Sequence, residues 1–203
     1  MAAHGALDLD LAPALIAREA KRLRKDIKIL LTSGQISPNI KNAVVSIEDS
    51  RFYEHNGVDF QGIGRALIKD ILSQSAAQGA STITEQFVKN ALAAQGSRTL
   101  FQKFREAALA YRLERHWSKD KILTEYLNTI YFGNGAYGIQ QAARTYFGTG
   151  AGHLTLPEAA LLAGLPADPS LYDPVRHPRA ARLRRHYVLQ TMFDQGKISE
   201  RQL

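Results

Sequence analysis

Apolar residues recur along the chain at intervals of three and four, which is the period of an α-helix. Apolar–polar alternation of useful length, the mark of a half-buried strand, is absent. The pattern predicts an amphipathic first segment over about 13–31 and helices over about 38–48, 60–73, 82–93, 99–116, 118–131, 139–147 and 178–194. We therefore expect an all-α fold without internal repeats.

Local signals predict where several of these helices begin. Ser37-Pro38 places a capping hydroxyl before a proline at the first helical position. Thr82-Ile83-Thr84-Glu85 and Thr155-Leu156-Pro157-Glu158 have the pattern of capping boxes. Ser199-Glu200-Arg201-Gln202 repeats the pattern just before the end of the chain at Leu203, so we expect the chain to be part of a longer protein.

Composition narrows the class of partner. The chain has 203 residues, 45% of them hydrophobic, which suits a single domain with a sizeable core. It carries 26 Lys+Arg against 19 Asp+Glu, a net charge of +7, which favours an anionic partner such as nucleic acid, a phosphorylated substrate or acidic lipid. The absence of cysteine excludes disulfides and thiolate chemistry. No apolar run is long enough to predict a transmembrane anchor in this chain.

The first segment with candidate chemistry is 48–57. The helix before it would place Glu48 and Asp49 at its C-terminal end, where the helix dipole raises the pKa of a carboxyl group and suits a proton acceptor. An ordinary acidic pair at the surface is the alternative reading.

A second candidate segment is 79–90, in which hydroxyls and first backbone amides precede a helix. Such a helix start can hold an anionic oxygen. Gln86, Lys89 and Asn90 lie three or four residues apart and share one face. Simple capping of the helix by Thr82 and Glu85 is compatible with this role.

A third candidate segment runs from Arg98 to Glu106. Lys103 and Glu106 are i,i+3 neighbours, and a carboxylate flanked by cations stays ionised and can help to hold a metal. Taken alone, the segment also fits an ordinary solvated charged face. We expect the buried stripe of this helix to lie on another face. Its predicted members are Leu100, Phe101, Phe104, Ala108 and Tyr111.

Together these segments resemble the family-51 glycosyltransferases, the domain of class A penicillin-binding proteins and monofunctional peptidoglycan transglycosylases. The resemblance covers about residues 40–188. The matching motifs are Glu48-Asp49-x-x-Phe52-x-x-His55-x-Gly57, Gly79-x-Ser81-Thr82-Ile83-Thr84-x-Gln86, Lys103-x-x-Glu106, Ser118-Lys119-Asp120-x-Ile122-Leu123 with Tyr126-Leu127-Asn128, and Glu158–Pro166 with Tyr172-Asp173-Pro174.

The resemblance implies a lysozyme-like helical fold with a small membrane-facing lobe, and lipid II and the nascent glycan chain as partners. It implies Glu48 and Glu106 as the catalytic residues, with Glu106 also a possible ligand of Mg²⁺ or Mn²⁺. The residues implied for substrate binding are Asp49, Phe52, His55, Ser81, Thr82, Gln86, Lys89, Asn90, Arg98, Lys103 and Arg105. It further implies the outer face of the bacterial cytoplasmic membrane, a possible fused transpeptidase domain and no nucleic-acid partner.

Some positions depart from the family pattern. The family usually has Gln-Gln at Glu85-Gln86, Arg-Lys at Gln102-Lys103, and often Glu at Thr124. The loss of the arginine removes one cation from the predicted pyrophosphate site.

We expect residues 38–203 to form the glycosyltransferase domain, with 60–80 as its mobile membrane-facing lobe, and leave residues 1–37 as an unassigned N-terminal segment. A glycan-cleaving enzyme of lysozyme or lytic-transglycosylase type is the alternative, because it also places carboxylates across a sugar cleft. A basic module that binds membrane or nucleic acid would not require these motifs.

Overall fold

The computed structural model describes residues 14, 16–19, 29–62, 64, 81–92 and 100–203, and these residues form helices without a β-strand. The longer helices are α2 (Pro38–Glu48), α4 (Ile83–Leu92), α5 (Leu100–Glu114), α6 (Lys119–Thr129), α7 (Ile139–Phe147), α8 (Leu156–Gly164) and α9 (Pro178–Asp194). Short 3-10 turns lie at Ser33–Gln35, Ala151–His153, Leu165–Ala167 and Glu200–Gln202. The predicted all-α class is confirmed, and it is consistent with a lysozyme-like domain.

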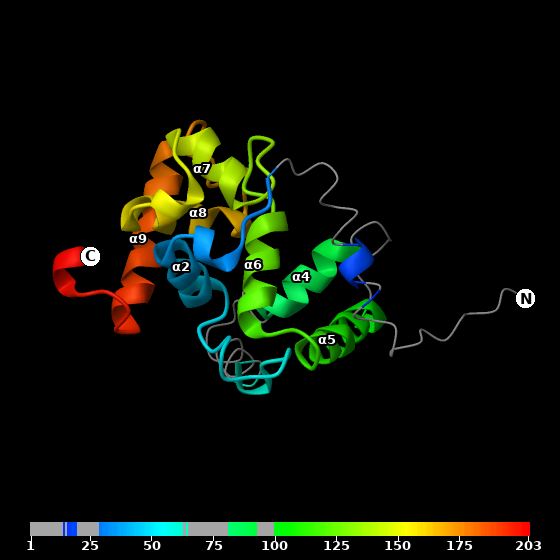
Figure 1. Ribbon diagram of the computed structural model, residues 1–203. Coiled ribbons are helices and arrows are strands. Elements are labelled where there is room, and N and C mark those ends of the chain that lie inside the picture. Colours follow the sequence, from blue (N-terminus) through cyan, green and yellow to red (C-terminus); the bar gives the residue numbers. More distant parts are fainter. Residues whose placement is uncertain (1–13, 15, 20–28, 63, 65–80, 93–99) are drawn as a thin grey trace, which may run out of the picture.

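Helix α6 lies between two groups of helices (Figure 1). On one side α2, α8 and α9 pack against one another, and on the other α4 packs against both α5 and α6. A continuous hydrophobic core joins the two groups, with Val44 of α2, Phe87 of α4 and Leu127 of α6 among its members. The C-terminal end of α2 leads into the loop 49–59, and this loop reaches α4.

The predicted helix starts are confirmed. The Ser37 side chain accepts a hydrogen bond from the backbone N–H of Asn39, and Pro38 occupies the first helical position of α2. Thr82 and Glu85 form a capping box, in which each side chain accepts from the other residue's backbone N–H. The predicted box that starts α8 at Thr155 is also present.

The predicted N-terminal helix is too long at its C-terminal end. Residues 16–19 are helical, whereas 29–32 are not, and 20–28 lie outside the described residues. The side-chain amide of Asn128 explains the non-helical end, because it pairs with both backbone groups of Leu31. Its Oδ1 accepts from the Leu31 N–H at 3.0 Å, and its Nδ2 donates to the Leu31 carbonyl at 2.8 Å.

The predicted buried stripe of α5 is wrong. Phe101, Phe104 and Tyr111 are 79%, 75% and 48% exposed, and Ala108 is exposed too. The helix instead buries its other apolar face, formed by Leu109, Ala110 and Leu113, where it packs against α4. Both faces have helical spacing, so periodicity alone did not distinguish the inner one.

The predicted membrane-facing lobe over 60–80 falls almost wholly outside the described residues, which include only 60–62 and 64 of it. Across the parts of the chain that are described, no helix combines the length and the apolar character needed to cross a bilayer.

Candidate active site

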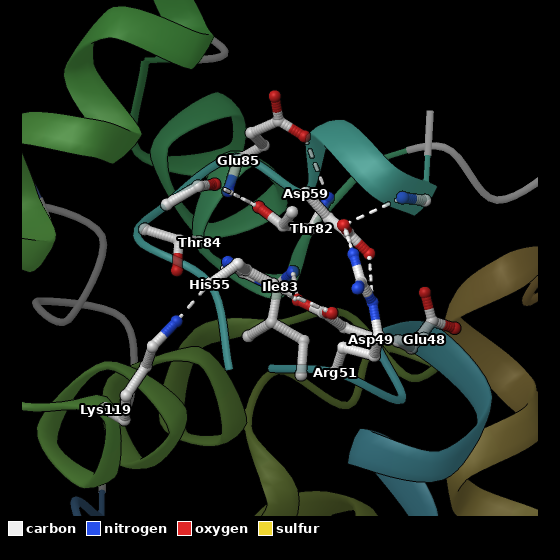
Figure 2. Close-up of polar contacts among 12 residues, drawn as sticks. Glu48, Asp49, Arg51, His55, Asp59, Thr82, Ile83, Thr84, Glu85 and Lys119 are labelled. Carbon is white, nitrogen blue, oxygen red and sulfur yellow. Dashed lines mark hydrogen bonds and ion pairs between the residues drawn. The ribbon is translucent and has the colours of Figure 1, made fainter. Parts of the chain in front are cut away.

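The carboxylate of Asp49 joins the end of α2 to the beginning of α4. Asp49 is the residue that follows α2, and its Oδ2 accepts a hydrogen bond from the Ile83 backbone N–H at 3.1 Å. The ring nitrogen Nε2 of His55 lies 3.0 Å from each Asp49 oxygen (Figure 2). Asp49 thus uses both oxygens to hold the loop 49–59 against the N-terminus of α4.

A partly buried ion pair supports the other side of the His55 ring. Lys119 Nζ lies 2.7 Å from Glu114 Oε2 and 3.5 Å from His55 Nδ1. An ammonium group only donates, so Nδ1 accepts, and Nε2 carries the ring proton that it donates to Asp49. Burial lowers the pKa of Lys119, and the nearby carboxylates of Glu114 and Asp49 oppose that shift.

The loop also lies close to the backbone of α5. Gly57 has a φ of 83°, and a Cβ atom there would stand 2.6 Å from the Ala110 carbonyl carbon. Any other residue would therefore be strained and would collide with the helix. The Thr82 hydroxyl donates to the Gly57 carbonyl at 2.7 Å, which fixes this contact from the side of α4.

The two ends of the loop are joined by a further ion pair. Arg51 contacts the Asp59 carboxylate, with Nε 3.1 Å from Oδ2 (Figure 2). Asp59 in turn accepts from the Gly62 N–H at 2.8 Å. The loop is thus tied at its start, its middle and its end.

Three amides at the start of α4 have partners within the protein, and the role of this helix start in holding an anionic substrate oxygen stays a prediction. The Thr82 N–H donates to Glu85, the Ile83 N–H to Asp49, and the Glu85 N–H to Thr82. These donors already have partners within the protein, so a substrate would have to displace a carboxylate or hydroxyl to reach them.

Glu48 differs from its neighbour Asp49 in having a single hydrogen-bond partner among the described residues. Its Oε2 accepts from Gln86 Nε2 at 2.7 Å, and among the described residues Oε1 has no hydrogen-bond partner. Burial raises the pKa of Glu48, the Gln86 hydrogen bond and the charge of Arg184 oppose this, and the Asp49 charge adds to it. A half-buried carboxylate with a raised pKa and one free oxygen is suited to accept a proton.

The second predicted cluster lies beside α4. Glu106 precedes Ala110 and Leu113 by four and seven residues, so it continues the inner face of α5. Burial raises the pKa of Glu85; the Thr82 N–H and Lys103 lower it, while the charges of Asp49 and Glu106 raise it. Glu85, Lys103 and Glu106 therefore share one electrostatic environment with the Asp49 loop.

Comparison with known proteins identifies the family. The family model described as Transglycosylase matches residues 15–193. The chain belongs to the transglycosylase family. In its enzyme class it is a peptidoglycan glycosyltransferase.

Similarity to individual proteins supports the same family. A protein of Cupriavidus necator whose name assigns it to the transglycosylases is 49% identical over 82% of this chain and 71% of its own length. Penicillin-binding protein 1A of Neisseria flavescens is 48% identical over 80% of this chain. Penicillin-binding protein 1F of Bacillus subtilis is 44% identical over 83%. The matched region spans only 20% and 24% of these two penicillin-binding proteins.

The remaining candidate site residues of this transglycosylase are less closely connected. Phe52 is fully buried, and Lys119 Nζ lies 4.4 Å from its ring centroid, so in this conformation it supports the loop from inside. Lys89 is exposed, and Ser81 and Asn90 are half-buried. Arg98 lies outside the described residues. Arg105 is half-buried, and within the described chain its Nε has no hydrogen-bond partner. The binding roles of these residues stay predictions.

Glu114, Lys119, Tyr126 and Arg184 take part in this arrangement and were not predicted as site residues. Glu114 pairs with Lys119, Tyr126 contacts Gln86, and Arg184 approaches Glu48. Lys119 and Tyr126 belong to the motifs that carry the family resemblance, and those motifs were the available signal. Arg184 lies on α9, outside the segments with candidate chemistry, and its position had no local signal.

The raised pKa of Glu48 predicts how the stability of the folded protein changes with pH. The folded protein binds the Glu48 proton more tightly than the unfolded chain, whose glutamates titrate near pH ~4.3. Stability is therefore lost as pH rises through the raised pKa, by about 1.4 kcal/mol for each unit of elevation. Glu48→Gln removes this loss, so thermal melts should show the variant gaining on the parent between pH 4 and pH 8.

The exposed Glu54, replaced by Gln, is the matched control and should show no such pH-dependent difference. A difference between Glu48→Gln and the parent that stays constant across this pH range would contradict the prediction.

Proposed function

We propose that this chain polymerises lipid II into β-1,4-linked glycan strands, with release of polyprenyl pyrophosphate and with Glu48 as the general base. The observation that carries the proposal is the contrast between two adjacent acids. Both oxygens of Asp49 accept hydrogen bonds, from His55 and from the Ile83 N–H. Among the described residues, Oε1 of Glu48 has no hydrogen-bond partner.

In the proposed reaction, Glu48 takes the proton from the 4-hydroxyl of the acceptor sugar. That oxygen attacks the anomeric carbon of the growing chain, and the bond from this carbon to the α-linked pyrophosphate breaks. The new bond is β-1,4, so the configuration inverts. The pyrophosphate leaves with the bonding electron pair, and Glu48 holds the proton until solvent removes it.

Departure of pyrophosphate needs positive charge more than a proton. Lys103 lies beside Glu106 at the N-terminal part of α5, and Arg98 and Arg105 are the other predicted cations. The charge of Lys103 lowers the pKa of Glu85, and the charge of Asp49 raises it, so the cation and the Asp49 loop act on the same carboxyl group. This arrangement supports a pyrophosphate site between α4 and α5.

We propose Mg²⁺ or Mn²⁺ as a cofactor of this site. The described residues hold no group of three or more side chains able to bind a metal by themselves. One or two carboxylates with substrate phosphates are the usual Mg²⁺ ligands, and Glu106 with nearby Glu85 fits that pattern. The ion would supply charge for the leaving pyrophosphate.

We also propose that the exposed stripe of α5, namely Phe101, Phe104, Ala108 and Tyr111, contacts the membrane. These residues recur at i, i+3, i+7 and i+10 and form one apolar face. Phe60, at the edge of the predicted lobe, is exposed as well. A lipid-linked substrate at the outer face of the cytoplasmic membrane would require such a surface near the pyrophosphate site.

Replacing Glu48 by Gln should reduce polymerisation by about 10²–10⁴-fold, because the amide keeps the shape and loses the proton acceptor. Gel analysis of product formed from lipid II measures the rate, and circular dichroism checks the fold.

Glu54→Gln, in the same loop, is the control and should polymerise like the parent. Polymerisation by Glu48→Gln within a few-fold of the parent would refute the assignment. Digestion of preformed glycan without polymer formation would favour the glycan-cleaving alternative.

Glu106→Gln should be severely impaired, and added Mg²⁺ or Mn²⁺ should stimulate the parent more than the variant. The reason is that the variant loses the carboxylate proposed to hold the ion. A metal titration of the initial rate after EDTA treatment measures this. A parent enzyme indifferent to both EDTA and added metal would exclude the metal.

Phe101→Asp with Phe104→Asp should reduce co-sedimentation with vesicles containing phosphatidylglycerol by several-fold, because the pair removes apolar area and adds negative charge. The control pair is Val175→Asp with Leu183→Asp, two exposed apolar residues away from α5. Equal vesicle binding by both folded double variants would contradict the proposed contact.

A further inference from the structure

Three helices contribute to one chain of hydrogen bonds that ends at Glu48. The Tyr126 hydroxyl of α6 lies 3.0 Å from Gln86 Oε1 of α4. Gln86 Nε2 lies 2.7 Å from Oε2 of Glu48, the last residue of α2. Tyr126 is fully buried, so its phenol has no access to solvent.

The direction of each hydrogen bond follows from the chemistry of the groups. An ionised carboxylate only accepts, so Gln86 must turn its NH₂ group toward Glu48. The amide oxygen then faces Tyr126, and the phenol must donate. Burial raises the pKa of Tyr126, and the charge of Glu48 raises it further, so the phenol keeps its proton wherever the base works.

While Glu48 is ionised, its carboxylate and the phenol favour the same orientation of the Gln86 amide. Once Glu48 is protonated, only the phenol opposes rotation, because the rotated amide would turn its NH₂ group toward the phenol proton. A terminal amide rotates readily between near-equivalent positions, and its oxygen and nitrogen exchange places when it does. An amide oxygen beside Glu48 repels the carboxylate and favours its protonated form. By opposing that orientation, the Tyr126 phenol on the far side of Gln86 favours the ionised form of Glu48.

We propose that Tyr126 is a positioning residue of the reaction. By donating to Gln86, it fixes the amide N–H on Oε2 of Glu48 and leaves Oε1 to accept the proton of the acceptor sugar. This inference rests on the proposed role of Glu48 as the base. Tyr126 itself is buried behind Gln86 and acts through that side chain.

The test is the pH dependence of kcat/KM for polymerisation of lipid II by the Tyr126→Phe variant. Glu48 must be ionised to act, and the Gln86 N–H favours ionisation. Loss of the hydroxyl should move the acidic limb to higher pH by about one unit, which lowers the rate on that limb about tenfold. KM should change less than twofold, because Tyr126 does not reach the substrate.

Tyr146→Phe is the matched control. Its hydroxyl donates to the Phe132 carbonyl at 2.8 Å, away from Glu48, so its profile should coincide with that of the parent. An unshifted acidic limb in folded Tyr126→Phe, or an equal shift in Tyr146→Phe, would overturn the proposal.

A double-mutant cycle with Gln86→Met adds a second readout. Methionine keeps the length of the side chain and removes the amide, so Gln86→Met should shift the acidic limb in the same direction. Adding Tyr126→Phe should then have no further effect, because the hydroxyl acts only through Gln86. Additive shifts of the acidic limb would refute the proposal that Tyr126 acts through Gln86. If Tyr126→Phe does not fold, an unshifted acidic limb in Gln86→Met would refute it instead.

Failure of the positioning role of Tyr126 and failure of the proposed function give different results. If Glu48→Gln retains activity, Glu48 is not the base and the proposed function fails. If Glu48→Gln is inactive and the Tyr126→Phe profile matches that of the parent, only the positioning role fails.

Discussion

The arrangement of the site depends on one buried carboxylate, that of Asp49. It lies between the C-terminal end of α2 and the N-terminal end of α4, and it accepts from the Ile83 N–H and from His55. A negative group at a helix N-terminus is stabilised by the helix dipole and by the first amides, which have no hydrogen-bond acceptor within the helix itself. The Lys119–Glu114 pair holds the far side of His55, so the loop, α4 and α6 are connected through a single acid.

This constraint separates two neighbouring acids into different roles. Both oxygens of Asp49 are hydrogen-bonded, to His55 and to the first amide of α4, whereas Glu48 is hydrogen-bonded to Gln86 of the same helix through one oxygen. Burial raises the pKa of Glu48, and the anchoring of Asp49 keeps a second negative charge close enough to raise it further. In the proposed function, Asp49 would hold the structure of the site and Glu48 would act in the reaction.

Helix α5 has two apolar faces with different surroundings. The face with Leu109 and Leu113 packs against α4, and Glu106 continues it toward Glu85. The face with Phe101 and Phe104 is exposed. In the proposed function, one helix would hold the pyrophosphate on its inner side and contact the bilayer on its outer side, which matches a substrate whose polar group is joined to a lipid.

The helical class, the starts of α2, α4 and α8, and the family motifs could all be predicted from the sequence alone, because capping and helical period depend on residues a few positions apart. Tertiary structure decided which face of α5 is buried, why the N-terminal helix ends before Leu31, and which partners Glu48 and Asp49 have. Those outcomes depend on contacts such as Leu31 with Asn128 and Gln86 with Tyr126, which join residues far apart in the chain. No local pattern records such a contact, since it exists only after the helices have packed.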